Sequence, residues 1–251
     1  AAPLRSGADV IGAVAVIEDV SEMQRVDAVR RDFVANVSHE LKTPIGALAL
    51  LAETLAGETD PKIVQRLSER VRNESFRVSH MVDDLLTLSR IEGNDSPNVD
   101  RFGVDLLVRE CVDRVHPVAE QRGVSIGVGP IDPDLAQVGD RRQIASALSN
   151  LLENAVKYSE RGDAVEVRVG TTDHEMAIVV QDHGIGIPSS ELERIFERFY
   201  RVDKGRSREE GGTGLGLAIV RKIVDSHGGE VHAGDAIEGG AVVTVQLPLA
   251  T

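Results

Sequence analysis

Apolar residues recur in alternating three- and four-residue steps over two long stretches near the start of the chain. This spacing predicts two helices that each carry a single apolar seam, as in a coiled coil. Pro44 is expected to bend the first helix locally, and Gly57 and the step Asp60-Pro61 are expected to end it. The first seam comprises Val34, Val37, Leu41, Pro44, Leu48, Leu51 and Leu55, and the second comprises Val64, Leu67, Val71, Glu74, Val78, Met81, Leu85 and Leu88.

The short connection between these helices predicts an antiparallel helical hairpin over residues 21–92. A single hairpin would leave its apolar seam exposed to water. We therefore expect two copies of the chain to form a homodimer through a four-helix bundle. The alternative is a hairpin that packs on its own chain, but the regular spacing of the seam favours the dimer.

Residues 10–20, VIGAVAVIEDV, predict a buried strand that ends in an acidic turn. One strand is not stable alone, so we expect residues 1–20 to be the end of an upstream sensor domain. The chain opens with Ala1 rather than Met, as a fragment would. A membrane anchor is expected only in segments outside this chain, because the apolar run 10–17 is too short to cross a bilayer.

Residues 93–100, GNDSPNVD, have the composition of a linker, and the pattern changes after them. The remaining residues, 101–251, alternate between helical and strand-like periodicity. This order predicts an α/β sandwich, with one sheet and helices on one of its faces. The expected helices are 106–121, 144–158 and 215–226, and the expected strands are 124–128, 164–169, 176–181, 230–233 and 241–247.

Composition and charge narrow the classes of protein. The 251 residues include 41% hydrophobic and 27% charged positions, which is typical of a soluble globular protein. A formal net charge of −13 argues against nucleic acid as a partner, because phosphate backbones require clustered Lys and Arg. The single cysteine, Cys111, excludes an internal disulfide and a Cys-rich metal site, and we expect it to be a small core residue.

A candidate nucleophile lies in the first predicted helix, in the segment SHELKTP at residues 38–44. At about 100° per residue, His39 lies opposite the seam residues Val37 and Leu41 and therefore faces solvent. An exposed neutral imidazole can act as a nucleophile, and a phosphoramidate formed on it would be accessible to a second protein. Thr43 lies one turn further along. Taken alone, a solvent-facing histidine on a helix is usually a bystander.

Three polar residues, Asn150, Asn154 and Lys157, share one face of the predicted helix 144–158. Amide oxygens are hard ligands that suit Mg²⁺, and a lysine supplies a point charge for phosphate. The alternative is an ordinary solvated face. Two asparagines in the middle of a helix nevertheless have low helix propensity and call for some compensation.

The segment DHGIGI at residues 182–187 directly follows a predicted strand. Asp182 would accept hydrogen bonds from an amino group, and the glycines would let a ligand approach the backbone closely. A simple turn at the end of a strand explains the same residues equally well.

The segment GGTGLGL at residues 211–217 opens the last predicted helix. Its glycines and the free N–H groups of a helix N-terminus would form a cradle for an anion. A dinucleotide-binding fingerprint would need a strand before it, whereas residues 203–211 are polar and charged, so the pattern disfavours a Rossmann fold.

In their order and spacing, these four segments resemble the H, N, G1 and G2 boxes of the sensor histidine kinases of two-component systems, in the PhoR-like class. The segment IFERFYR at residues 195–201 resembles the F box of that family. The resemblance covers about residues 30–249, and residues 18–20 resemble, more weakly, the end of a PAS sensor domain.

The resemblance implies a dimerisation and phosphotransfer hairpin over residues 21–92 and a catalytic domain of the Bergerat ATP-binding fold over residues 101–251. His39 would accept the γ-phosphoryl group of ATP. Glu40 would orient or deprotonate the imidazole, although neighbouring side chains on a helix diverge. Thr43 would position a water for dephosphorylation of a partner protein.

For the nucleotide, the resemblance implies that Asp182 accepts the adenine amino group and that Tyr158 lies near the adenine. Asn154 and Asn150 would hold Mg²⁺ on the triphosphate, and residues 184–211 would form a lid. The other implied nucleotide-binding residues are Lys157, Gly184, Gly186, Arg201, Gly212, Thr213, Gly214, Leu215 and Gly216.

The implied partner is the receiver domain of a response regulator, which would take the phosphoryl group on an aspartate and be dephosphorylated in turn. The implied location is the cytoplasmic portion of a membrane-anchored sensor. His183 stands where the family usually has a small polar residue, a departure that could alter the pocket. Two alternatives remain: a catalytically silent ATP-binding scaffold or receptor, and an ATPase of the gyrase and Hsp90 type, which lacks a histidine-bearing coiled coil immediately upstream.

Overall fold

The computed structural model describes residues 2–6, 9–14, 21–93, 98–172, 174–202, 213–236 and 239–249. The chain divides into two compact units, residues 1–43 and 44–251, and the division falls within one helix. The first unit begins with an antiparallel pair of strands, β1 (Ala2–Ser6) and β2 (Asp9–Val14). Only β2 was expected from the sequence. Residues 15–20, which carry the weak PAS resemblance, lie outside the described residues.

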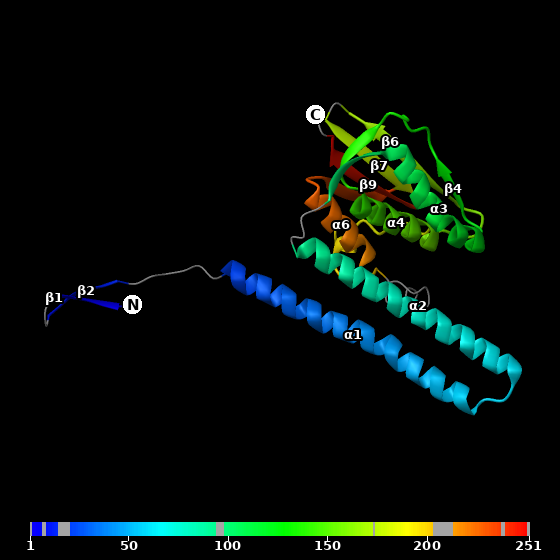
Figure 1. Ribbon diagram of the computed structural model, residues 1–251, viewed down its shortest axis with the longest axis horizontal. Coiled ribbons are helices and arrows are strands. Elements are labelled where there is room, and N and C mark those ends of the chain that lie inside the picture. Colours follow the sequence, from blue (N-terminus) through cyan, green and yellow to red (C-terminus); the bar gives the residue numbers. More distant parts are fainter. Residues whose placement is uncertain are drawn as a thin grey trace. The chain divides into compact units, whose positions relative to one another are not determined.

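Two long helices follow, as the seams predict: α1 (Ser21–Gly57) and α2 (Pro61–Glu92) (Figure 1). Helix α1 continues through Pro44 and ends at Gly57. Asp60 caps α2 by accepting a hydrogen bond from the Lys62 N–H at 2.9 Å, and a proline at the first helical position is compatible with such a start. The predicted end of the first helix is therefore confirmed.

The polar member of the second seam has a local partner. Glu74 forms a salt bridge with Arg77 one turn further along α2, at 3.2 Å. Three apolar seam residues of the same helix, Leu67, Met81 and Leu88, are buried. The seam is thus largely apolar, and its one charged position is neutralised within the helix.

Residues from Val99 onward form a sheet covered by helices on one side (Figure 1). The five strands are ordered β4-β6-β7-β9-β8, with β4 parallel to β6 and every other neighbouring pair antiparallel. The helices are α3 (Val104–Arg122), α4 (Arg141–Tyr158) and α6 (Gly216–Ser226), and the strands are β4 (Ser125–Val128), β6 (Ala164–Thr171), β7 (Glu175–Gln181), β8 (Glu230–Asp235) and β9 (Ala241–Pro248). The predicted α/β sandwich is confirmed.

A second, two-stranded sheet was not expected. Strands β3 (Val99–Gly103) and β5 (Ala136–Asp140) pair antiparallel, with Val99 opposite Asp140. The linker expected over residues 93–100 is therefore too long, because its last two residues belong to β3. The sequences of β3 and β5, VDRFG and AQVGD, lack a run of β-branched residues, and the two strands are far apart in the chain. Neither strand could therefore be predicted from local sequence.

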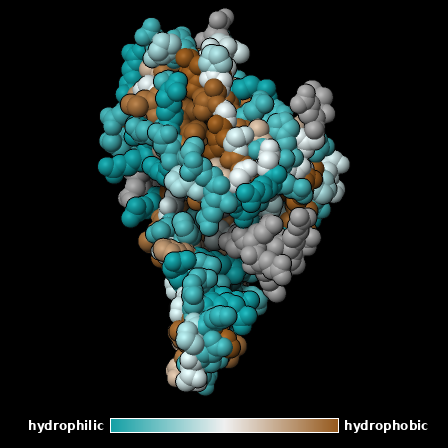
Figure 2. Space-filling model, turned by 90° about the vertical axis from the view of Figure 1, so that its right-hand side faces the viewer, coloured by the Kyte–Doolittle hydropathy of each residue, from teal (hydrophilic) through white to brown (hydrophobic). Residues whose placement is uncertain are grey.

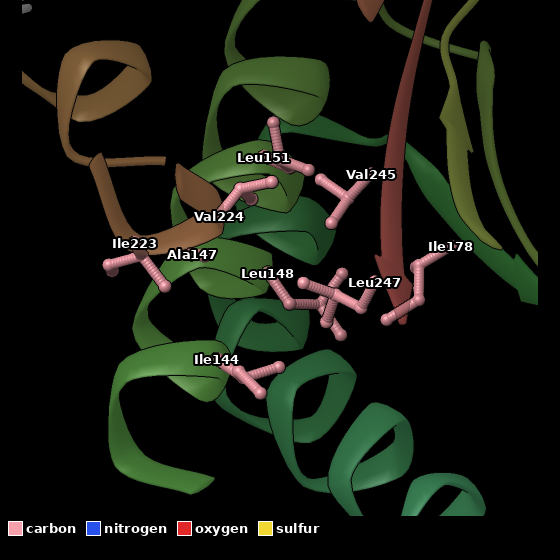
Figure 3. A pocket seen from close by; sticks show the side chains of 9 residues that line it. All are labelled: Ile144, Ala147, Leu148, Leu151, Ile178, Ile223, Val224, Val245 and Leu247. Atoms are coloured by element: carbon pink, nitrogen blue, oxygen red, sulfur yellow. The ribbon is translucent and has the colours of Figure 1, made fainter. Parts of the chain in front are cut away.

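The core lies between α4, α6 and the sheet (Figure 3). Ile144, Leu148 and Leu151 of α4 face Ile223 of α6 and Leu247 of β9, among other apolar side chains. The void left between these layers is only about 10 Å³, so the side chains interdigitate closely. This rigid support fixes the ends of α4, α6 and β7, which carry the candidate site.

A histidine fastens α6 to the start of α4. The Asp140 side chain caps α4 by accepting from Arg142 and Gln143, while the Asp140 N–H donates to His227 Nε2 at 3.0 Å. His227 Nδ1 lies 2.8 Å from the Ile223 carbonyl oxygen, so the ring bridges the two helices.

The face of the molecule shown in Figure 2 is largely hydrophilic. Figure 2 shows one face, where polar side chains surround a strip of apolar surface in the upper part of the view. Among the described helices, none combines the length and the apolar character needed to cross a membrane.

Candidate functional site

A cavity of about 510 Å³ opens between α4, α6, α2 and the loop that follows β7. Its size falls in the range of sites that take a molecule as large as a nucleotide. Most of the nucleotide-binding residues implied by the sequence line it: Asn150, Asn154, Lys157, Tyr158, Asp182, Gly186, Arg201, Thr213, Gly214 and Gly216. Four segments that are far apart in the sequence therefore meet at one cavity.

Asp182 is held firmly at the end of β7. Its Oδ1 accepts backbone N–H bonds from Gly184 at 2.9 Å and from Ala241 at 3.0 Å. Burial raises the pKa of this carboxyl group, and the two backbone hydrogen bonds only partly offset that effect. Both bonds end on Oδ1, so Oδ2 is the oxygen that Asp182 can offer to a ligand in the cavity.

Two glycines, Gly186 and Gly240, allow the backbone to pack closely around Asp182, and only the first of them was expected from the sequence. Gly240 has φ +88°, and a Cβ there would lie 2.1 Å from the Asp182 carbonyl oxygen. Gly186 has φ +69° and packs against the Gly240 carbonyl. The turn before β9 and the loop after β7 can approach this closely only because neither position carries a side chain.

Gly184, implied as a nucleotide contact, is not among the residues that line the cavity. Instead, it packs against the main chain at the end of α4, with a would-be Cβ 2.1 Å from the Tyr158 carbonyl oxygen. His183, the departure from the family pattern, turns its Nδ1 to the Ala164 carbonyl oxygen at 2.8 Å. That contact fastens the loop to β6.

The polar face of α4 faces the cavity as its spacing predicts. Asn150 donates from Nδ2 to the Ser146 carbonyl oxygen at 3.0 Å, which leaves its Oδ1 directed at α6. A Cβ on Gly216 would lie 2.7 Å from that Oδ1 and 3.7 Å from Nδ2 of Asn154. The Lys157 ammonium lies 5.0 Å from the centre of the Tyr158 ring, so a cation and an aromatic face stand together at this wall.

The start of α6 forms the opposite wall. Gly214 has φ +72° and its carbonyl oxygen accepts from the Phe199 N–H at 2.8 Å. Leu215 is fully buried at the N-cap and does not line the cavity, whereas Gly216 and Leu217 do. No side-chain cap is present at this described helix end, so its N–H groups can bind an anion. Gly212 lies outside the described residues.

The segment resembling the F box adds an aromatic ring and a cation. Tyr200 donates a hydrogen bond to Glu191, and this bond raises the pKa of the phenol. The Arg194 guanidinium lies 4.3 Å from the centre of the Tyr200 ring. Arg201, the next residue, is half-buried in the cavity wall.

Three residues of α2, namely Arg77, His80 and Asp84, also line the cavity, and the sequence analysis missed them. They carry no local signal, because each is an ordinary polar residue on an amphipathic helix. Their spacing of three and four residues places them on one helical face, but only the folded chain reveals that this face borders the site.

The candidate nucleophile, His39, lies in the first compact unit. His39 on α1 has a side chain that is 75% exposed, as the helical wheel predicts. Its Nδ1 lies 4.0 Å from a carboxylate oxygen of Glu40. Thr43 donates from Oγ1 to the His39 carbonyl oxygen at 3.4 Å.

Two family models match the chain. Residues 29–94 match the His Kinase A (phospho-acceptor) domain, and residues 139–251 match the histidine kinase-, DNA gyrase B- and HSP90-like ATPase domain. Together these matches cover the segments that carry His39 and the cavity.

Relatives with curated names agree with these models. The chain is 42% identical over 238 residues to the sensor-like histidine kinase SenX3 of Mycolicibacterium smegmatis, covering 94% of this chain and 62% of that protein. It is 41% identical over 250 residues to the sensor histidine kinase WalK of Bacillus subtilis, covering 97% of this chain and 41% of that protein. The chain thus spans less than two thirds of the length of these relatives.

A crystal structure of the histidine kinase ThkA in complex with the response regulator TrrA shares the fold. The TM-score is 0.72 at 21% sequence identity, covering 99% of this chain and 74% of that one. On the family models and the named relatives, the chain belongs to the sensor histidine kinases.

Proposed function

We propose that the chain is an ATP-dependent protein-histidine kinase that phosphorylates its own His39. The observation that carries the proposal is the pairing of an exposed histidine in the phospho-acceptor match with a cavity lined by Asp182, Asn154 and Lys157 in the ATPase match. Neither feature alone would suffice, since exposed histidines are common and many folds bind nucleotides.

In this proposal the adenine ring enters the cavity at Asp182. The carboxylate holds two backbone N–H groups on Oδ1, and Oδ2 accepts the adenine amino group. Guanine carries a carbonyl oxygen at the equivalent position, so an ionised carboxylate there selects adenine. The phosphates then lie toward Lys157, Arg201 and the N-terminus of α6, where positive charge and free N–H groups are available.

The residues present also fit Mg²⁺. Asn150 directs an amide oxygen toward α6, and Asn154 lies one turn further along the same wall. Among the described residues, no group of three or more His, Cys, Asp or Glu side chains could form an all-protein cage. Mg²⁺ is commonly held by one or two protein oxygens together with phosphate oxygens, which is what Asn150 and Asn154 could provide. When bound, the ion would neutralise phosphate charge.

At the acceptor, Oε1 of Glu40 lies 4.0 Å from Nδ1 of His39, and a small rotation of either side chain would bring them within hydrogen-bonding distance and keep the proton on Nδ1. The lone pair on Nε2 is then free to attack. The Nε2–P bond forms as the bond between the γ-phosphorus and the β,γ-bridging oxygen breaks, and ADP leaves with that oxygen. Because the His39 side chain is exposed, a second protein could reach the product.

We propose further that the phosphoryl group passes to an aspartate of a response regulator and that the kinase acts as a homodimer. The first part is supported by the family and by a fold shared with a kinase solved together with its regulator. The second part is supported by the apolar seams of α1 and α2, which the single chain leaves half-buried at Leu48, Leu51 and Leu85.

The test is incubation with γ-labelled ATP and Mg²⁺, followed by acid treatment of the labelled protein. We expect label that is stable to alkali and labile to acid, and we expect His39→Gln to abolish it. His116→Gln, a matched change at an exposed helical histidine outside the motif, should keep it. Label that persists in His39→Gln would refute the acceptor, and ATP binding without any label would favour a silent scaffold.

A further inference from the structure

One face of α2 borders the phosphate-binding end of the cavity. Helices α2 and α6 lie side by side (Figure 1), and Oδ2 of Asp84 accepts a hydrogen bond from Oγ1 of Thr213 at 2.9 Å. The two residues are 129 positions apart in the chain. This bond joins the helical hairpin to the segment that leads into α6.

Thr213 connects that bond to the start of α6. Its Oγ1 also accepts from the Leu215 N–H at 3.1 Å, one residue before the helix begins at Gly216. The carboxylate of Asp84 is therefore linked, through one hydroxyl group, to the helix end whose N–H groups would bind phosphate. A carboxylate near a helix N-terminus is stabilised by the same N–H groups and dipole as a phosphate.

A second carboxylate lies at the same wall. Glu153 of α4 lines the cavity, and burial raises the pKa of both Glu153 and Asp84. The negative charge of Asp84 further raises the pKa of Glu153, whereas the nearby His80 lowers the pKa of both carboxyl groups. A triphosphate that enters this end of the cavity brings several further negative charges, and like charges in a partly buried site repel.

We propose that Asp84 and the terminal phosphates of a nucleoside triphosphate compete for Thr213 and the N-terminus of α6. Asp84 occupies this end of the site in the arrangement described here, and a bound triphosphate displaces it. Nucleotide loading would thereby release the contact between α2 and the start of α6. The inference rests on the proposed function for the identity of its ligand.

The test is calorimetric titration of the whole chain with ATP, ADP and adenosine. In Asp84→Asn the hydrogen-bond acceptor remains but the charge is lost. We expect this variant to bind ATP about tenfold more tightly, which corresponds to about 1.4 kcal/mol, to bind ADP with a smaller gain, and to bind adenosine unchanged. Asp83→Asn is the matched control, because Asp83 is an exposed neighbour that does not line the cavity, and its affinities should not change.

A cross-link tests the competition directly. The one native cysteine, Cys111, is buried, so Asp84→Cys combined with Thr213→Cys adds two thiols that face each other and leaves no other accessible thiol. We expect oxidation to join them, with the yield suppressed by ATP and Mg²⁺ but not by adenosine.

Four outcomes distinguish the competition from its alternatives. Equal ATP affinity in Asp84→Asn and the unmutated chain overturns the competition, as does a gain for adenosine as large as that for ATP. A cross-link yield that ATP leaves unchanged overturns it too. Failure of every variant and of the unmutated chain to bind ATP would instead refute the proposed function itself.

Discussion

The carbonyl oxygen of Tyr158, at the end of α4, lies 2.1 Å from the point where a Cβ atom would sit on Gly184. Gly184 is therefore a packing residue for two walls of the cavity: it lets the loop after β7 touch the end of α4. A side chain there would push apart the two segments that carry Asp182 and Tyr158.

We predict that Gly184→Ala destabilises the fold by about 1–3 kcal/mol, the usual cost of forcing a methyl group into a tightly packed site. Gly170→Ala is the control, since no atom lies within 4 Å of a Cβ at that position. Chemical denaturation of both variants measures the difference. Equal free energies of unfolding for the two variants would show that the loop moves aside without cost.

Asp182→Asn should weaken ATP binding by about 10- to 150-fold, because a hydrogen bond to a charged group contributes about 1.5–3 kcal/mol. Asparagine keeps an oxygen for the Gly184 and Ala241 N–H groups, so the loop should stay folded. Titration with ATP and with GTP measures the change. Unchanged ATP affinity would exclude Asp182 as the acceptor of the adenine amino group.

The same carboxyl group predicts a dependence on pH. Burial raises the folded-state pKa of Asp182 above its unfolded value, so ionised Asp182 lowers the stability of the fold. This cost is absent below the pKa of Asp182 in the unfolded chain, about 3.9. It grows as the pH rises from that value through the higher pKa of Asp182 in the folded chain. Asp182→Asn should therefore unfold at a higher temperature than the unmutated chain at pH 7, and the gap should narrow toward pH 4. A gap that widens on acidification would contradict the assigned direction of the shift.

Leu48→Asp together with Leu85→Asp should convert a dimer into monomers at micromolar concentration. Both side chains are only half-buried within one chain, and full burial of a leucine contributes roughly 1.5–3 kcal/mol. Sedimentation measures the mass. Leu86→Asp, which is 49% exposed and off the seam, should leave the dimer intact. If the unmutated chain sediments as a monomer, the bundle is refuted.

Thr43→Ala should keep autophosphorylation near normal but lose dephosphorylation of the regulator. The hydroxyl group donates to the His39 carbonyl oxygen at 3.4 Å, a long and weak bond, so its loss should cost the helix little. The two rates are measured side by side. Equal losses in both would mean that Thr43 serves only the helix backbone.

The sequence predicted those parts whose signal is local. The seams of α1 and α2 repeat over many turns, and Gly57 and the Asp60-Pro61 step are short-range signals, so the two helices and the end of α1 agree with the structure. Asn150 and Asn154 could be assigned to one face from spacing alone. Strands β3 and β5 could not be predicted, because VDRFG becomes a strand only where it meets AQVGD, more than thirty residues later.

The wall formed by α2 was missed for the same reason. Nothing in the sequence near Asp84 indicates that it meets Thr213, because that hydrogen bond depends on how a helix of the hairpin packs against α6. Gly240 is similar: its φ of +88° and its contact with Asp182 arise from the pairing of β7 with β9. The local sequence pattern identified the candidate ligand-binding residues, such as Asp182 and Asn154. Tertiary contacts determined that Asp84 also borders the site and that Gly240 packs against Asp182.

The cavity also carries every tyrosine of the chain. The sequence has two tyrosines and no tryptophan, and both tyrosines, Tyr158 and Tyr200, line the cavity. Tyrosine emission from the unlabelled protein therefore originates at this one place. An adenine ring that stacks near Tyr158, or a change at Tyr200 and its hydrogen bond to Glu191, would alter the entire signal, so ligand entry could be followed in real time without a dye.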